Sequence, residues 1–305
     1  MKKIKVLSAA ILAAAKASSA WACACGCGVF DVGTSSMFPE DSGGTAFLNY
    51  DFQDQNQNWS GTSSARGANN DDKELKTQTF TPGARYMFNR SWGAQAEIPV
   101  VSRTFDSAAN GGAISWTGLG DIRLRGIYTG FSDDLSGGLT FGVKLPTGSY
   151  NHTDPAGGID RDSQIGSGST DLLLGAFHRG DLAGSLNWNW FAQAQLELPV
   201  LKQGGYRPGL ETDVALGIYY EGLSLGRAKI SPVAQVIGTW HGRDNGAAAN
   251  PDNSGYQRVL LAPGIEFRLH PVKIYADVEL PVYENATGNQ LVAPALFKVS
   301  VSYMF

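Results

Sequence analysis

The sequence predicts an all-β chain, a transmembrane antiparallel up-and-down β-barrel of about 12 strands, and three observations indicate it. Only 17% of the 305 residues are charged, below the roughly 25% of an average soluble domain, while 38 residues are Gly. From residue 44 onward, apolar and polar residues alternate with period two in runs of about ten residues, as in strands with two different faces. The gaps between these runs are alternately short and long, which is typical of bacterial outer-membrane barrels.

The first 22 residues predict a signal peptide. Three lysines precede an apolar stretch, Val6 to Ala15, and Ala20-Trp21-Ala22 offers a cleavage site with small residues at both ends. Removal of this segment with its four lysines would change the formal net charge from −4 to −8, a poor fit to nucleic-acid binding. We therefore expect residues 1–22 to be a signal peptide, 23–43 a Cys-rich periplasmic N-terminal segment and 44–305 the outer-membrane β-barrel.

The strands follow one another in order along the rest of the chain. The last is the clearest, because Phe297, Val299, Val301, Tyr303 and Phe305 alternate with polar residues and Met304. The same alternation predicts strands at 44–54, 76–88, 92–103, 118–131, 137–147, 169–179, 186–200, 208–220, 228–240, 257–269, 272–283 and 293–305.

The gaps between these strands predict which end of the barrel faces which compartment. Those at 89–91, 132–136, 180–185 and 270–271 are short, whereas those at 55–75, 104–117, 148–168, 241–256 and 284–292 are long and mostly polar. Short turns face the periplasm and long loops face outward, which puts both termini in the periplasm. Aromatic residues near the strand ends are expected in the interfacial girdles: Tyr86, Phe88, Trp92, Tyr128, Phe131, Trp188, Tyr219, Tyr303 and Phe305.

A strand-end pattern Glu-[Ile/Leu]-Pro-Val occurs at 97–100, 197–200 and 279–282, and Lys144-Leu145-Pro146-Thr147 is a variant of it. Two Gly-rich segments, Gly118 to Leu124 and Gly166 to Leu172, each open a strand. With these motifs the chain resembles the family of outer-membrane transporters named after the meta-pathway of phenol degradation. The resemblance implies an outer-membrane barrel that passes small solutes. The Cys-rich start described below is not part of that pattern. The prolines also have a local explanation, since a residue without a backbone donor belongs at a strand end or bulge.

The phase of the alternation places charged residues inside the barrel. On the lipid face a charge costs roughly 2–4 kcal/mol at the bilayer midplane, so inward placement is favoured. A barrel of twelve strands is intermediate in width between small closed barrels and wide porins. Its size is compatible with two alternatives, a narrow channel or an interior that paired Arg and Glu side chains close. A set of Glu97, Glu197 and Glu279 around the lumen would favour cations. The candidate residues for lumen selectivity are Glu97, Arg123, Arg125, Lys144, Glu197, Asp277 and Glu279.

Three cysteines, Cys23, Cys25 and Cys27, begin the expected mature chain at two-residue spacing. As thiolates they could bind Cu(I) or Zn(II), although no Cys-x-x-Cys pair or nearby His completes a standard site. Acylation of Cys23 and disulfide pairing, within the chain or with a partner, are the alternatives.

The sequence shows none of the common enzyme motifs, so we expect a protein that is not an enzyme. We predict an outer-membrane barrel of a Gram-negative bacterium that passes or binds small solutes and contacts outer-membrane lipid and lipopolysaccharide. The alternative is a barrel whose Cys23/Cys25/Cys27 segment binds a metal or docks a periplasmic redox partner.

Overall fold

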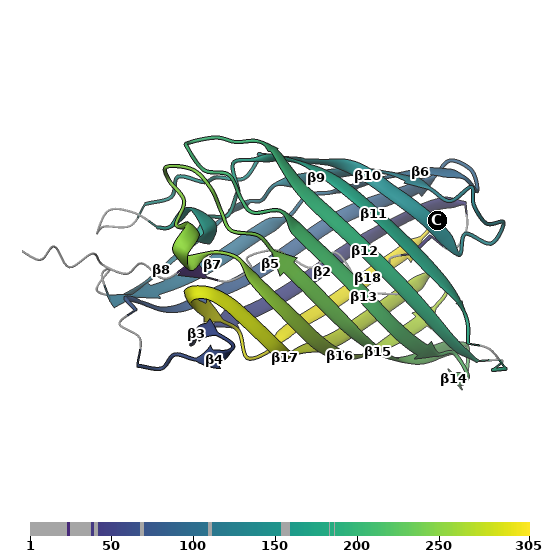
Figure 1. Ribbon diagram of the computed structural model, residues 1–305. Coiled ribbons are helices and arrows are strands. Elements are labelled where there is room, and N and C mark those ends of the chain that lie inside the picture. The colour runs from purple at the N-terminus through teal and green to yellow at the C-terminus, as the bar shows by residue number, and fades with distance from the viewer. Residues whose placement is uncertain are drawn as a thin grey trace, which may run out of the picture.

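A closed sheet of antiparallel barrel strands forms most of the described fold in the computed structural model (Figure 1). The structure describes residues 23–24, 38–39, 42–67, 70–108, 112–153, 159–182, 184–185 and 187–305. Within this part of the chain each of the barrel strands pairs with the barrel strands before and after it, and β18 (Leu296–Met304) pairs with β2 (Gly43–Gln55) to close the barrel. The predicted twelve-stranded barrel is confirmed.

Two of the twelve strands are each interrupted once. The third consists of β6 (Trp92–Glu97) and β7 (Val100–Ser107), and the fourth consists of β8 (Gly112–Leu119) and β9 (Ile122–Tyr128). The other barrel strands are β5 (Asp72–Met87), β10 (Gly137–Leu145), β11 (Thr170–Asp181), β12 (Trp188–Leu201), β13 (Glu211–Tyr220), β15 (Ala228–His241), β16 (Tyr256–Leu269) and β17 (Val272–Val292). Short additional strands are β1 (Cys23–Ala24), β3 (Gln57–Gly61), β4 (Ser63–Ser64) and β14 (Leu223–Leu225).

The two faces of each strand have different surroundings, as the alternation predicts. In β18, Phe297 is 43% exposed on the outer wall, whereas Lys298 is 3% exposed in the lumen. This arrangement follows because only closure of the sheet satisfies the backbone in a membrane, and the outward side chains then meet lipid. Among the described residues, no helix has the length and apolar character to cross a bilayer.

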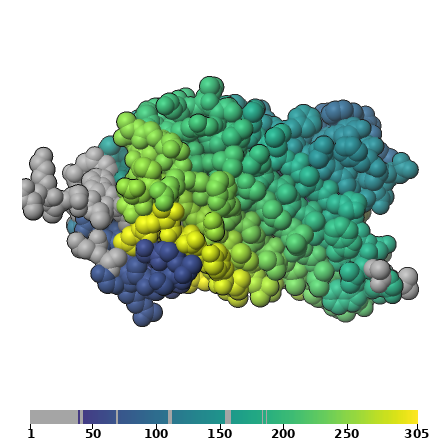
Figure 2. Space-filling view, viewed as in Figure 1, coloured from purple at the N-terminus to yellow at the C-terminus, as the bar shows by residue number. Residues whose placement is uncertain are grey.

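The sheet extends further at the long-loop end than the sequence predicts. The predicted loop 104–117 is mostly a continuation of β7 and β8, and the predicted loop 284–292 is the outer part of β17. This part of β17 pairs with β3, so its backbone groups are satisfied beyond the neighbouring strands. Figure 2 shows the dark-blue segment that contains β3 and β4 against the yellow end of β17. The predicted loops 148–168 and 241–256 contain the short 3-10 helices η3 (Arg161–Ser163) and η4 (Pro251–Asn253).

The N-terminal strand lies at an unexpected end of the barrel. β1 pairs in parallel with Gln290 and Leu291 of β17, at the long-loop end rather than at the short-turn end where a periplasmic segment is expected. The reason is that the outer part of β17 extends past its barrel neighbours and offers an edge for a further strand. Phe38 and Pro39 belong to no strand and lie at the short-turn end.

The predicted aromatic girdle is confirmed for most of its residues and is wrong for Tyr219. Trp92, Phe131 and Tyr303 are well exposed on the outer wall, but Tyr219 is buried in the lumen. Its position follows from the alternation in β13, in which the phase that places Asp213 inside also places Tyr219 inside.

Candidate functional site in the lumen

Five of the predicted lumen residues meet on one wall, built from β6, β9, β10 and β12. Glu97 forms an ion pair with Arg125, and both side chains are buried. The Gln95 amide also donates to the Glu97 carboxylate at 2.7 Å. Arg125 reaches further across the wall and donates to the Gln195 side chain at 3.3 Å. The charge of Glu97 is therefore neutralised within the wall.

A second group continues this wall toward the long loops. Lys144 forms ion pairs with both Glu197 and Asp171. Arg123 lies 3.4 Å from Glu197, with 12% of each side chain exposed. These contacts arise because the register sets Lys144 opposite Arg123 on one side and opposite Asp171 on the other. We refer to these ion-paired residues, Glu97, Arg123, Arg125, Lys144, Asp171 and Glu197, as the charged band.

The remaining two predicted residues, Asp277 and Glu279, are buried on β17, away from the charged band. Asp277 accepts hydrogen bonds from the Tyr275 hydroxyl at 2.7 Å and from the Gln235 amide at 2.9 Å. Lys298 lies opposite Asp277 in the register. Its ammonium nitrogen forms an ion pair with a carboxylate oxygen of Asp51 at 3.8 Å.

The three glutamates of the Glu-[Ile/Leu]-Pro-Val pattern are spread evenly around the barrel. Glu97 is on β6, Glu197 on β12 and Glu279 on β17, so successive members are four barrel strands apart. Two of them are already paired with Arg or Lys, so they do not form a ring of unpaired like charges. The selectivity assigned to this set from the sequence stays a prediction.

The prolines of the same pattern lie at interruptions of the ladder, as the local explanation expects. Pro99 separates β6 from β7, Pro199 lies at the register shift between β11 and β12, and Pro281 lies at the shift between β16 and β17. A residue that cannot donate to the ladder is placed where the ladder is already irregular.

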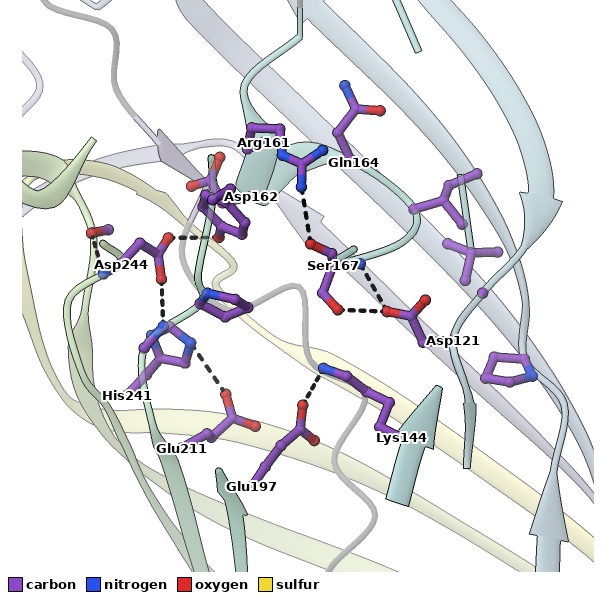
Figure 3. Close-up of a pocket in the computed structure, with 18 of the residues that line it drawn as sticks. Asp121, Lys144, Arg161, Asp162, Gln164, Ser167, Glu197, Glu211, His241 and Asp244 are labelled. Atoms are coloured by element: carbon purple, nitrogen blue, oxygen red, sulfur yellow. Dashed lines mark hydrogen bonds and ion pairs between the residues drawn. The ribbon is translucent and has the colours of Figure 1, made fainter. Parts of the chain in front are cut away.

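A polar cavity of about 160 Å³ lies under the outer loops, directly above the charged band (Figure 3). Arg123, Lys144 and Glu197 line it from the barrel wall. Residues within 161–167 of the loop 148–168 line it on the loop side and are held by Asp121, whose carboxylate accepts from the Ser167 amide at 2.8 Å and from the Ser167 hydroxyl at 2.7 Å. The Gly148 amide donates to the same carboxylate at 2.9 Å.

Arg161 fixes the inner part of that loop. Its guanidinium donates to the backbone carbonyls of Tyr150, at 2.8 Å, and Ser167, at 3.2 Å, and it lies over the rings of Tyr150 and Tyr206. On the opposite side of the cavity, Asp244 accepts from the Tyr206 hydroxyl at 2.7 Å. The outer mouth is therefore narrowed by a loop with specific polar anchors.

The lumen also holds an apolar region that the sequence analysis missed. Close to the short turns, seven strands turn apolar or aromatic side chains inward. Phe38, which belongs to no strand, fills the centre and is 2% exposed. We call the seven wall residues the apolar ring: Met87, Ile127, Phe177, Phe191, Tyr219, Val233 and Tyr275. The available signal was the strand phase, which places these seven residues on the same face as the charges.

The metal prediction cannot be followed in the described residues. Cys25 and Cys27 lie outside them, as does the expected signal peptide 1–22, and only the strand pairing of Cys23 is described. No group of three or more His, Cys, Asp or Glu is placed to hold a metal in the part of the chain that the structure describes. Metal binding or partner docking by Cys23, Cys25 and Cys27 stays a prediction.

Comparison with known proteins agrees with the fold. A family model described as "Putative MetA-pathway of phenol degradation" matches residues 54–161. The search of curated proteins found no match.

Solved structures are similar over nearly the whole chain. An outer-membrane channel from Pseudomonas putida F1 is 14% identical, with a TM-score of 0.66, over 90% of this chain and 100% of that chain. The β-domain of the Bordetella autotransporter BrkA is 15% identical, with a TM-score of 0.52, over 87% of this chain and 100% of that chain. At sequence identities this low, the structural similarity shows that the fold is shared and nothing more. The chain is an outer-membrane β-barrel whose resemblance to the family named after phenol degradation is confirmed over residues 54–161.

Proposed function

We propose that the chain is a channel through which small solutes cross the outer membrane. The observation that carries this proposal is a pair of cavities at opposite ends of one lumen. The outer cavity has a volume of about 160 Å³, and the inner one, lined by Phe38, Arg85 and Lys273 among others, has a volume of about 260 Å³. Between them lie the charged band and the apolar ring, so a solute would meet polar groups first and apolar groups second.

Two further points support this function. The Pseudomonas putida structure with the same fold is itself titled an outer-membrane channel. The description of the matching family names the degradation of phenol, a small aromatic compound, and this supports small aromatic compounds as the class of solute.

The lumen charges would set a weak preference for cations. The seven predicted selectivity residues comprise four acids and three bases, and ion pairing in the charged band cancels most of their field. Removing a base should therefore increase the cation preference, because it leaves a carboxylate uncompensated.

Single-channel conductance in a planar bilayer tests the proposal. We expect small steps from the refolded full chain, with a reversal potential in a KCl gradient that shifts toward cations in Lys144→Gln. Glu74→Gln, at an exposed ion pair on the outer part of β5, is the matched control and should not shift it. The proposal is wrong if neither the wild type nor Phe38→Ala conducts while circular dichroism and a heat-modifiable gel shift show both to be folded.

A further inference from the structure

The side chains that surround the Phe38 ring, chiefly Phe177 and Phe191, form a binding position for an aromatic ring, which we call the Phe38 seat. The Phe38 ring stacks on Phe177, with centroids 5.3 Å apart and planes 18° apart, and meets Phe191 edge-on at 5.7 Å. Both are favoured arrangements of aromatic pairs. The ring centroid of Phe191 is in turn 6.3 Å from that of Tyr219, so a further aromatic residue packs behind Phe191. The chain's own side chain thus shows which chemical group the seat accepts.

Two guanidinium groups lie beside the seat. Arg85 donates to the backbone carbonyl of Phe38 at 3.2 Å, and Arg179 donates to the backbone carbonyl of Pro39 at 3.3 Å. They come from β5 and β11, on different sides of the segment. The seat therefore combines an apolar slot with cationic donors that now contact oxygen acceptors.

Phe38 is held by contacts that a solute could replace. Residues 38 and 39 belong to no strand, and the contacts described for them are ring packing and the two arginine hydrogen bonds. The inner cavity of about 260 Å³ adjoins Phe38 and Arg85, and it is larger than the roughly 150 Å³ apolar cavity known to hold benzene. If Phe38 left, water would contact the apolar ring at a free-energy cost that a new apolar group would remove.

We propose that the Phe38 seat is a binding site for a monocyclic aromatic compound that carries an oxygen acceptor, such as a carboxylate, and that this compound displaces Phe38. The ring of the solute takes the place of the Phe38 ring against Phe177 and Phe191. Its acceptor oxygen takes the place of the backbone carbonyls at Arg85 and Arg179, where a carboxylate forms stronger, charge-assisted bonds. The inference rests on the proposed channel function, because the site lies on the solute pathway.

Equilibrium binding of benzoate to the refolded full chain, measured by dialysis, tests this site. Phe38→Ala should bind benzoate at least tenfold more tightly than the wild type, since the competing ring is gone. Adding Phe177→Leu to Phe38→Ala should weaken binding by about threefold to tenfold, the equivalent of one aromatic pair. Phe141→Leu, on the lipid-facing side of β10, is the matched control and should leave binding unchanged.

Two further probes separate the two halves of the site. Cyclohexanecarboxylate, which has the charge but no aromatic face, should bind Phe38→Ala more weakly than benzoate does. Arg179→Gln should weaken binding of benzoate but not of toluene, which lacks the oxygen.

The outcomes distinguish this inference from the channel function. Equal benzoate affinity in the wild type and Phe38→Ala overturns the site, as does an equal effect of Phe177→Leu and Phe141→Leu. If Phe177→Leu fails to fold by the gel shift, Phe191→Leu replaces it. A Phe38→Ala protein that conducts ions but does not bind benzoate overturns the inference alone, and one that binds benzoate but never conducts overturns the channel alone.

Discussion

The charged band and the apolar ring lie on the same inner face of the same strands, yet they have opposite chemistry. In the band, Glu97 and Arg125 are buried as a pair, and Lys144 is shared by two carboxylates. In the ring, Phe177 and Phe191 are buried against a side chain from outside the barrel wall, Phe38. The comparison shows that a side chain that points into this barrel need not be polar. In both regions, however, it contacts a partner that compensates for the loss of water.

The kind of partner differs for a physical reason. A buried charge is strongly destabilising unless an opposite charge or hydrogen-bond donors compensate for lost water, and neighbouring strands supply these in the band. An apolar side chain needs only the exclusion of water, which Phe38 provides in the ring. The predictions below test how strongly each region depends on its partners.

The largest effect is expected when one member of the band is removed. Glu97→Gln leaves the buried Arg125 without its carboxylate, and loss of one partner of a buried pair destabilises by about 3–5 kcal/mol. Urea unfolding of the refolded protein, followed by tryptophan fluorescence, measures this change. The control is Glu74→Gln, whose solvent-exposed pair with Lys76 should contribute far less to stability than the buried pair. Equal effects of the two substitutions would contradict the distinction between buried and exposed pairs.

A smaller effect is expected where the apolar ring meets buried polar residues that lie outside the charged band. Tyr275 belongs to the apolar ring, but its hydroxyl donates to Asp277 at 2.7 Å and accepts from the Gln235 amide at 3.0 Å. Tyr275→Phe keeps the ring and removes both bonds, so we expect a loss of about 1.5–3 kcal/mol in unfolding free energy. Tyr303→Phe, on the lipid-facing side of β18, is the control. A loss no larger than that of Tyr303→Phe would mean that Tyr275 acts by packing alone.

The smallest effect concerns two half-buried acids that lie near each other at the outer rim. Asp72 begins β5, some 15 residues from its short turn, beyond the roughly 9–11 residues that span a bilayer, and Asp160 precedes η3. Nearby, Ile159 packs with Leu75 and Phe105 and docks the loop 148–168 on the rim. Burial, helped by the charge of Asp160 and opposed by a hydrogen bond from Ser107, raises the pKa of Asp72 to about 7. Burial raises the pKa of Asp160 to about 6.

The sign of the pH effect follows from these raised values. Asp72 and Asp160 bind protons more tightly when the loop is docked than when it is free, because with the loop free their carboxyls have the ordinary pKa of 3.8. Docking is therefore strongest below about pH 4, weakens as the pH rises, and stays at its weakest above about pH 7. Nearby Asp71 increases the Asp72 shift and Lys73 reduces it. Hydrogen exchange of residues 148–153 and 159–168 should be faster at pH 8 than at pH 5 after correction for the intrinsic rate. Asp72→Asn should flatten that difference, and an unchanged pH dependence would show that the acid pair does not control docking.

The sequence by itself determined the number of strands, the alternation of short turns and long loops, and the face on which most residues lie. It placed Lys298 inside and Phe297 outside, and both placements are confirmed. These features are local, because the direction of a side chain on a strand depends only on its position along that strand. The same rule would have placed Tyr219 inside had it been applied without the expectation that aromatic residues belong to the girdle.

Only the tertiary structure decided which inward residues meet. Arg125 pairs with Glu97 and Lys144 with Glu197 because the register between neighbouring strands brings segments that are separate in the sequence together. The anchoring of the loop 148–168 by Asp121 and the insertion of Phe38 into the apolar ring depend on chain outside the strands, where no period exists. A local pattern can fix the direction of a side chain, but its partner is set by the register between strands and by the course of the loops, which the pattern does not contain.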